Sequence, residues 1–206
     1  MELKELSTND NPLKGLERYK IVLASASPRR FELLSMLDIP FEVRKIDDCD
    51  ESYPDNLTPE SIPEFLSRKK SEAARRVMMS NELIITADTI VIVDGRPIGK
   101  PKDAVDAKLM LRTLSGKTHT VITGVTIVTR DKTLSFSAES KVEFADLDDR
   151  EITFYINNYL PFDKAGAYGI QEWIGAVAIK AIDGSFYNVM GLPIHRLYAA
   201  LKEFAC

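Results

Sequence analysis

The chain has 206 residues, of which 45% are hydrophobic and 28% charged, and its formal net charge is −4 at pH 7. Such a length can bury roughly 70% of the unfolded surface, which is enough for one domain or two closely joined lobes. The negative charge argues against a nucleic-acid binder or a membrane-surface protein, and no apolar run approaches a membrane span. The two cysteines have no metal-ligand spacing and make no disulfide framework, so we expect a cytoplasmic protein.

Residues 1–19 are mostly polar and contain no apolar core of a signal peptide. We expect them to form an N-terminal extension, partly helical around Leu13 and Leu16. Residues 20–206 contain no low-complexity segment or internal repeat and are predicted to form a single domain.

Residues 21–23 are a short apolar run that predicts a buried strand, and an amphipathic helix is predicted to follow. Between them, Ser25 and its small neighbours are compact enough to let a ligand approach the backbone. Ser27 is a good N-cap, and Pro28 suits the first helical position because its missing N–H costs nothing there. The apolar face of the helix is predicted to contain Phe31, Leu34 and Leu37.

Arg29 and Arg30 fall in the first turn of this helix, where free backbone N–H groups already make a positive end. Two cations at that place favour an anion site, and phosphate is the anion that helix N-termini commonly bind. The alternative is a solvated basic pair on a surface helix.

The helix should stop at residues 38–40, and residues 41–46 can form a second strand. An acidic loop follows, which is either solvated or supplies ligands to a divalent cation. Its acidic residues are Asp47, Asp48, Asp50 and Glu51.

Ser61 and Glu64 have the spacing of a capping box, and a long helix is predicted from there to about Met79. Lys69 lies within its apolar stripe and Lys70 at the edge. Either lysine could point into a cleft and bind a phosphate, or only extend along the apolar surface to solvent. Helical spacing alone does not decide between them.

Residues 83–93 are the most apolar run and predict a central strand that continues into a hairpin at residues 94–95. Asp88 lies in the middle of this strand. A buried carboxylate needs a partner, so Asp88 is a metal ligand, a general base, or a structural aspartate paired with a cation. Lys100 follows in a loop between Gly99 and Pro101, which suits a preorganised contact with a ligand.

Asp103 is predicted to cap a helix that ends at Ser115-Gly116, and residues 120–129 and 133–144 are predicted to form an antiparallel hairpin. His119 begins the first of these strands and is expected to be structural. Another helix should begin at residues 148–151.

The small-residue loop 161–171 ends at Gln171, whose side chain has the donor and acceptor that reading a base edge requires. Within it, Asp163 and Lys164 could pair with each other or bind a ligand. Residues 176–182 and 185–189 suggest two strands, and a final helix should begin at Pro193. This order of elements predicts a mixed α/β fold with a sheet that is not all parallel.

Seven segments together resemble the Maf family of nucleoside triphosphate pyrophosphatases, over about residues 20–204. Three of them are Ser-Ala-Ser-Pro-Arg-Arg at 25–30, Asp-Glu at 50–51 and Ser-Arg-Lys-Lys at 67–70. The others are Ala-Asp-Thr-Ile-Val at 87–91, Gly-Lys-Pro at 99–101, Leu-Ser-Gly-Lys-Thr-His at 114–119 and Asp-Lys-Ala-Gly-Ala-Tyr-Gly-Ile-Gln at 163–171.

The resemblance implies hydrolysis of the α–β anhydride of a nucleoside triphosphate, with a divalent cation, Mg²⁺ or Mn²⁺, as cofactor. It implies the Maf and inosine-triphosphatase-like fold, a mixed twisted sheet with flanking helices and two lobes around a deep cleft. A homodimer is a further expectation from the family.

The resemblance also assigns roles to individual residues. Asp88 matches the proton acceptor, and Glu51 matches an acidic position near the metal, so that Glu51 and Asp88 together could hold the cation. The positions that match phosphate contacts are Ser25, Arg29, Arg30, Lys70 and Lys100. The residues that mark the branch preferring dTTP and UTP are Arg29, Thr89 and Gln171. The alternative function is that of a non-catalytic, nucleotide-binding regulator of cell division.

Overall fold

The computed structural model of the chain describes residues 11–46 and 49–206, and in these residues the strands form one mixed sheet. Its order is β2-β1-β3-β5-β6-β7, and β4 pairs with β3. The pairs β1–β2 and β1–β3 are parallel, and all the others are antiparallel. The strands are β1 (Lys20–Leu23), β2 (Glu42–Val43), β3 (Glu82–Val93), β4 (Arg96–Ile98), β5 (Thr118–Val128), β6 (Thr133–Phe144) and β7 (Ile179–Asp183).

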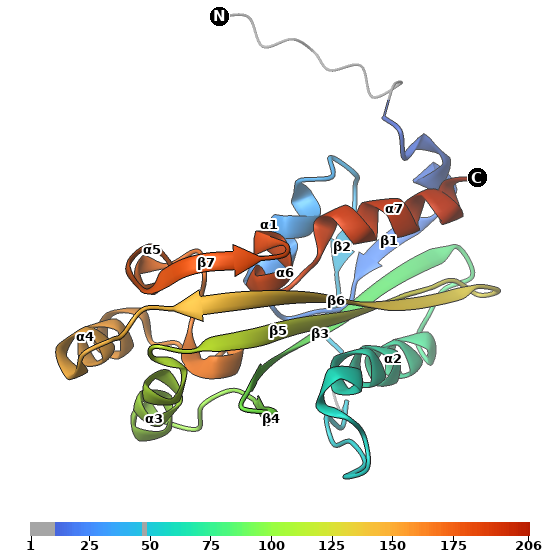
Figure 1. Cartoon of the computed structure of the whole chain (residues 1–206). Helices are drawn as coiled ribbons and strands as arrows, with labels where there is room; N and C mark the ends of the chain where they lie inside the picture. Colours follow the sequence, from blue (N-terminus) through green and yellow to red (C-terminus); the bar gives the residue numbers. More distant parts are fainter. Residues whose placement is uncertain (1–10, 47–48) are drawn as a thin grey trace, which may run out of the picture.

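Helices cover both faces of the sheet: α2 lies on one side, and α1, α6 and α7 lie on the other (Figure 1). The α-helices are α1 (Pro28–Ser35), α2 (Ile62–Arg75), α3 (Ala104–Leu114), α4 (Asp149–Tyr159), α5 (Trp173–Ala178), α6 (Phe186–Met190) and α7 (Ile194–Ala205). Short 3-10 helices within residues 11–46 and 49–206 are η2 (Lys14–Arg18), η3 (Pro59–Ser61) and η4 (Ala165–Ala167). This arrangement confirms the predicted mixed α/β fold with flanking helices.

The side chains of β3 alternate between the two faces of the sheet, and both faces are buried. Ile90 and Ile92 pack with Ile62 and Leu66 of α2. The odd-numbered residues, such as Val91, belong to the main core on the opposite face. Asp88 therefore faces α2, whereas Thr89 faces α1 and α6.

Gly124 allows α2 to lie unusually close to the sheet. A Cβ atom at this position would lie 2.3 Å from the backbone N of Glu64 and 2.4 Å from the carbonyl O of Pro63. Gly124 is also the β5 partner of Asp88 in the β3–β5 register. The missing side chain thus sets the distance between α2 and the strand that carries Asp88.

The sheet has a gap beside the middle of β3. On one edge of this strand, β1 pairs with residues 82–85 and β4 pairs with residues 91–93. Among the described residues, no strand pairs with that edge between them. The gap lies at the carboxyl end of β1, which is where ligands bind in open α/β sheets.

Most of the long periodic segments fold as predicted. The hairpin of β5 and β6, the cap of α3 by Asp103 and the final helix α7 are confirmed. At the start of α4, Asp148 and Glu151 form a complete capping box.

Several local predictions were wrong. Of the strands predicted at 176–182 and 185–189, the first is found as β7 but begins only at Ile179, after the short helix α5. The second is instead the helix α6, which begins where the Ser185 side chain accepts a hydrogen bond from Asn188 N. The predicted strand at 41–46 is reduced to the two residues of β2. Phe31 is 49% exposed, and Leu33 is buried in its place.

The capping box predicted at Ser61 and Glu64 does not form, and α2 ends at Arg75 rather than near Met79. Ser27 lies at the N-cap position of α1, as predicted. The Ser27 side chain makes no capping hydrogen bond, although Pro28 occupies the first turn as expected. The Ser61 hydroxyl donates to the carbonyl of Thr58 instead of capping α2. At Ser61 a local hydrogen bond to the backbone thus satisfies the hydroxyl in place of the helix cap.

The stretch before β1 packs against the last helix. Leu13 and Leu16 are buried, and a Cβ atom on Gly15 would lie 1.7 Å from the carbonyl O of Ala205. Arg18 donates to the carbonyl oxygens of Phe204 and Cys206. The helical structure expected around Leu13 and Leu16 is therefore confirmed.

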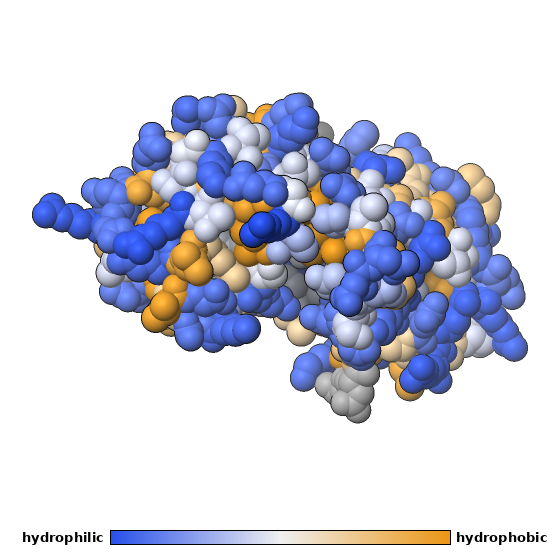
Figure 2. Space-filling model, turned by 60° about the horizontal axis from the view of Figure 1, so that its bottom comes forward, coloured by the Kyte–Doolittle hydropathy of each residue, from blue (hydrophilic) through white to orange (hydrophobic). Residues whose placement is uncertain are grey.

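Asp47 and Asp48, of the predicted acidic loop, lie outside the described residues. Within the part of the chain that the structure describes, no helix is long and apolar enough to cross a membrane. Figure 2 shows a face dominated by hydrophilic side chains, with hydrophobic ones in small groups.

Candidate active site

A cavity of about 630 Å³ opens at the gap beside β3. This volume is in the range of small-molecule binding sites. All the residues that the sequence analysis assigned to the site line it: Ser25, Arg29, Arg30, Glu51, Lys70, Asp88, Thr89, Lys100 and Gln171. The structure thus brings together side chains that are separated by up to 146 residues in the sequence.

Ser25 and Arg30 form one wall of the cavity, at the carboxyl end of β1. Ser25 is 9% exposed, and its hydroxyl accepts a hydrogen bond from the backbone N of Ser27 at 3.2 Å. Arg30 donates from Nε to the carbonyl of Gly191 at 2.9 Å and from Nη2 to Thr89 Oγ1 at 3.1 Å. These contacts fix the plane of the guanidinium before any ligand binds.

Burial lowers the pKa of Arg30 from its ordinary value, and the negative charge of Asp88 opposes this effect. A guanidinium remains protonated at neutral pH even so. Arg30 therefore presents a permanent, oriented positive charge to the cavity, as an anion site requires.

Arg29 contacts a different segment of the cavity lining from Arg30. Its Nη1 contacts Asp163 Oδ2 at 2.6 Å, and Asp163 belongs to the loop between α4 and η4. Desolvation acts to raise the pKa of Asp163, but hydrogen bonds from Lys164 and Arg29 outweigh it and lower that pKa. The predicted contact between Asp163 and Lys164 is found as an ion pair of 2.7 Å.

Lys70 lies between two carboxylates at the centre of the site. Its Nζ is 2.5 Å from Asp88 Oδ1 and 2.8 Å from Glu51 Oε1. Desolvation acts to raise the pKa of Glu51, but the hydrogen bond from Lys70 and the charges of Lys70, Lys100 and Arg30 lower it. Both acids are consequently held next to a cation, inside a cavity lined by six basic side chains: Arg29, Arg30, Lys45, Lys70, Lys100 and Lys164.

The choice between Lys69 and Lys70 is settled by their contacts. Lys69 Nζ binds Asp50 Oδ2 at 2.8 Å and the carbonyl of Ser52 at 2.8 Å, away from Asp88. Of these two lysines, Lys70 is the one that lines the cavity. Asp50 is therefore a partner of Lys69.

Gln171 lies in a loop that is anchored by buried polar groups. The Tyr155 hydroxyl accepts from the backbone N of Gly169 at 3.0 Å and donates to Glu172 in a short hydrogen bond. Lys164, whose side chain is 9% exposed, pairs with Glu172 at 3.1 Å. These contacts hold the loop on both sides of Gln171.

Several residues that line the cavity were not predicted as site residues from the sequence. These are Lys45, Cys49, Ala165, Tyr168, Met190 and Gly191, among others. Gly191 ends α6, and because residues 185–189 were predicted to be a strand rather than this helix, no local pattern could have identified it. Burial raises the pKa of Cys49, which keeps this thiol protonated at neutral pH.

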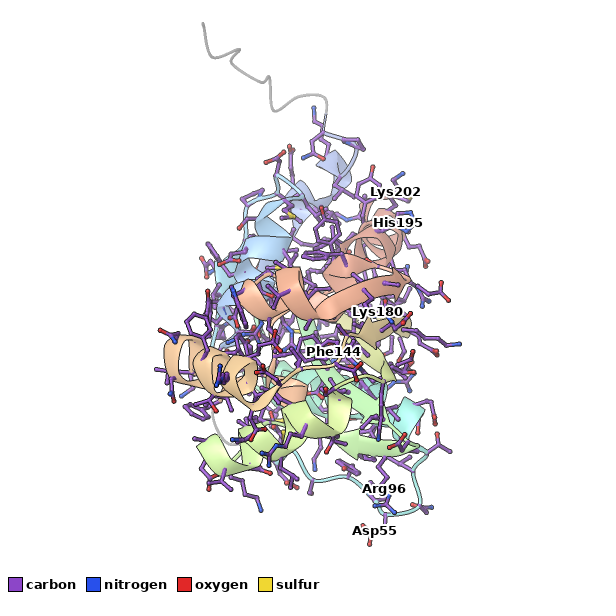
Figure 3. The ribbon with its side chains drawn as sticks, turned by 60° about the vertical axis from the view of Figure 1, so that its left-hand side comes forward. Asp55, Arg96, Phe144, Lys180, His195 and Lys202 are labelled. Carbon is purple, nitrogen blue, oxygen red and sulfur yellow. The ribbon has the colours of Figure 1, made fainter. Side chains whose placement is uncertain are left out.

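Neither histidine lines the cavity. His195 lies on the exposed side of α7, whereas Phe144 points into the interior of the molecule (Figure 3). His119 packs edge-on against Phe144 and bonds through Nε2 to the Tyr168 hydroxyl at 2.7 Å. Its contacts are those of a structural residue, as expected.

The carboxylates of Glu51 and Asp88 both contact Lys70 Nζ and therefore lie close to each other. Among the described residues, no group of three or more His, Cys, Asp or Glu side chains could hold a metal ion. Mg²⁺, however, is commonly bound by one or two carboxylates together with substrate phosphates and water. The donor set of Glu51 and Asp88 fits such a cation once a phosphate ligand completes it.

Comparison with known proteins adds an independent line of evidence. The family described as Maf-like protein matches residues 20–204. A protein of Porphyromonas gingivalis named dTTP/UTP pyrophosphatase is 57% identical over 194 residues, which cover 93% of this chain and 98% of that protein. A protein of the same name from Parabacteroides distasonis is 56% identical over 192 residues, covering 93% and 100%.

Among solved structures, a HAM1 protein from Coxiella burnetii aligns with a TM-score of 0.48 and 14% sequence identity. The alignment covers 90% of this chain and 99% of that one.

Proposed function

Because the chain belongs to the Maf family, we propose that it is a nucleoside triphosphate pyrophosphatase that hydrolyses dTTP and UTP to the monophosphate and pyrophosphate. The observation that carries this proposal is one cavity in which Asp88 pairs with Lys70 and which five further basic side chains line. A triphosphate carries several negative charges, and cations aimed at it both bind it and stabilise the charge that develops on the leaving group.

In this proposal, Asp88 is the proton acceptor. A water molecule attacks the α-phosphorus, the bond from this phosphorus to the α–β bridging oxygen breaks, and pyrophosphate leaves with the electron pair. The proton of the water passes to the Asp88 carboxylate. Phosphate oxygens compete with Asp88 for Lys70, which contacts it at 2.5 Å, so substrate binding frees the carboxylate for this step.

The phosphates are bound by Ser25, Arg29, Arg30, Lys70 and Lys100, all of which line the cavity. Nucleotide preference is assigned to Arg29, Thr89 and Gln171. This part of the proposal is supported by the anchored loop around Gln171 and by the contact between Arg30 and Thr89 at 3.1 Å.

The proposed cofactor is a divalent cation, Mg²⁺ or Mn²⁺, held by Glu51 and Asp88. When bound, such a cation neutralises phosphate charge and polarises phosphoryl oxygens. The proposal further takes residues 20–206 as one catalytic domain, working in the cytoplasm as a homodimer.

The test is pyrophosphate release from dTTP and UTP with Mg²⁺, by the wild type and by Asp88→Asn. Asn is nearly isosteric with Asp but does not accept the proton, so we expect kcat to fall by about 10² to 10⁴. No release from any triphosphate by the wild type, together with nucleotide binding, would favour the alternative of a non-catalytic regulator of cell division. Equal rates for the wild type and Asp88→Asn would show that Asp88 is not the proton acceptor.

A further inference from the structure

A chain of hydrogen bonds runs from the cavity into the core. Arg30 Nη2 lies 3.1 Å from Thr89 Oγ1, which lies 2.9 Å from Thr123 Oγ1. Thr123 Oγ1 in turn lies 3.1 Å from the carbonyl O of Asn188. Thr89 and Thr123 are direct partners in the antiparallel β3–β5 register, so the contact is built into the sheet.

The two ends of this chain determine the direction in which every proton is donated. A guanidinium can only donate hydrogen bonds, and a carbonyl oxygen can only accept them. Each threonine hydroxyl has one proton to donate. All three contacts are hydrogen bonds only if Thr123 donates to Asn188 and Thr89 donates to Thr123.

Thr89 therefore has no proton left to offer to a ligand. Its oxygen accepts from Arg30 and retains one further lone pair. Thr89 is only partly buried and lines the cavity, so this lone pair is available to a nucleotide. Thr123 is fully buried and does not line the cavity, so it can act only through Thr89.

We propose that Thr123 is a positioning residue that keeps Thr89 as an acceptor towards the bound nucleotide. This inference rests on the proposed function. Uracil and thymine present an imide N3–H, which is a donor, whereas the ring N3 of cytosine is an acceptor. An acceptor at Thr89 can pair with the N3–H of uracil or thymine. It leaves the acceptor N3 of cytosine without a partner, which costs binding free energy.

The experiment compares Thr123→Val, which has the same shape without the hydroxyl, with Thr123→Ser, which keeps it. The carbonyl of Asn188 retains a hydrogen bond from the backbone N of Gly191 at 3.0 Å, so the valine variant orphans no buried acceptor. Thr126→Val is the matched control. Thr126 is a fully buried threonine of the same strand whose hydroxyl contacts Ser67 on the face away from Thr89.

For each protein, kcat and KM are measured with UTP, dTTP and CTP, and affinities are measured with the α,β-methylene analogues of UTP and CTP. We expect Thr123→Val to reduce the preference for UTP over CTP about tenfold, through KM and the analogue affinities, with kcat for UTP little changed. The Thr123→Ser and Thr126→Val proteins should keep the wild-type preference.

An unchanged preference in Thr123→Val, a shifted preference in Thr123→Ser, or an equal shift in Thr126→Val would each overturn the inference. If Thr123→Val does not fold, Thr123→Ala removes the same hydroxyl without adding volume and is expected to give the same shift. The analogue affinities separate this inference from the proposed function. If the wild type binds the analogues but hydrolyses nothing, the catalytic proposal fails while the affinities still test Thr123.

Discussion

His119 should make the stability of the protein sensitive to mild acid. The ring is 2% exposed, and its only polar contact among the described residues is Nε2 with Tyr168, since Nδ1 has no hydrogen-bond partner there. A protonated ring would be a buried charge with an unpaired N–H. Burial accordingly lowers the pKa of His119 from 6.5 to about 4.

The sign and size of the effect follow from this shift. Between pH 6.5 and 4 the unfolded chain binds a proton at His119 that the folded protein does not, so stability falls as the pH falls. A difference of about 2.5 pKa units corresponds to about 3 kcal/mol in total, of which about 2 kcal/mol is lost by pH 5. Carboxylates with lowered pKa values, such as Glu51 and Asp163, lose their contribution only below about pH 4.5.

The assay is urea unfolding at pH 7 and pH 5, followed by circular dichroism, for the wild type, His119→Gln and His195→Gln. Glutamine does not titrate, so His119→Gln should lose about 2 kcal/mol less than the wild type between the two pH values. His195 is exposed on α7, and its variant should behave as the wild type does. The same pH dependence in His119→Gln and the wild type would refute the reasoning.

The other predictions concern the active site and the sheet beneath it. Glu51→Gln should raise the Mg²⁺ concentration for half-maximal activity at least tenfold, and an unchanged metal dependence would remove Glu51 from the metal site. Gly124→Ala should lower the free energy of unfolding by about 2 kcal/mol or more in urea titrations, since its Cβ would meet the backbone of α2 at 2.3 Å; a wild-type midpoint would contradict this close approach. Arg30→Ala should lower kcat/KM for all triphosphates alike, by about 10- to 100-fold, whereas Arg29→Ala should change their ranking. Equal losses on every substrate in both variants would contradict the distinction between the two arginines.

The fold could be predicted wherever a long segment has a clear period. The strand β3, the β5–β6 hairpin and the helix α7 are of this kind, and the structure confirms them. In residues 173–190 the strand β7 was predicted but the helices α5 and α6 were not, because three elements of five or six residues follow one another there. Elements so short show no full period, and Ser185, which caps α6, was interpreted as the start of a strand.

The members of the site could be predicted by type and by resemblance, but their pairings could not. The sequence indicates that Asp88 needs a partner, but Lys70 is 18 residues away and Glu51 is 37 residues away. Only the packing of α2 onto β3, which Gly124 permits, brings Lys70 rather than Lys69 to Asp88. Such contacts depend on how helices and strands are placed relative to one another, and no local sequence pattern predicts that placement.

The structure gives a physical reason why Arg29 and Arg30 should differ in their effect on nucleotide preference. Arg30 contacts Thr89, but the proton of Thr89 is directed by Thr123, so the loss of Arg30 leaves Thr89 an acceptor. The ranking of nucleotides should then persist although every phosphate contact is weaker. Arg29 instead pairs with Asp163 at 2.6 Å, in the loop that leads to Gln171. Its removal takes one contact from the start of that loop, which carries a side chain that can read the base, so selection among nucleotides should change as well as affinity.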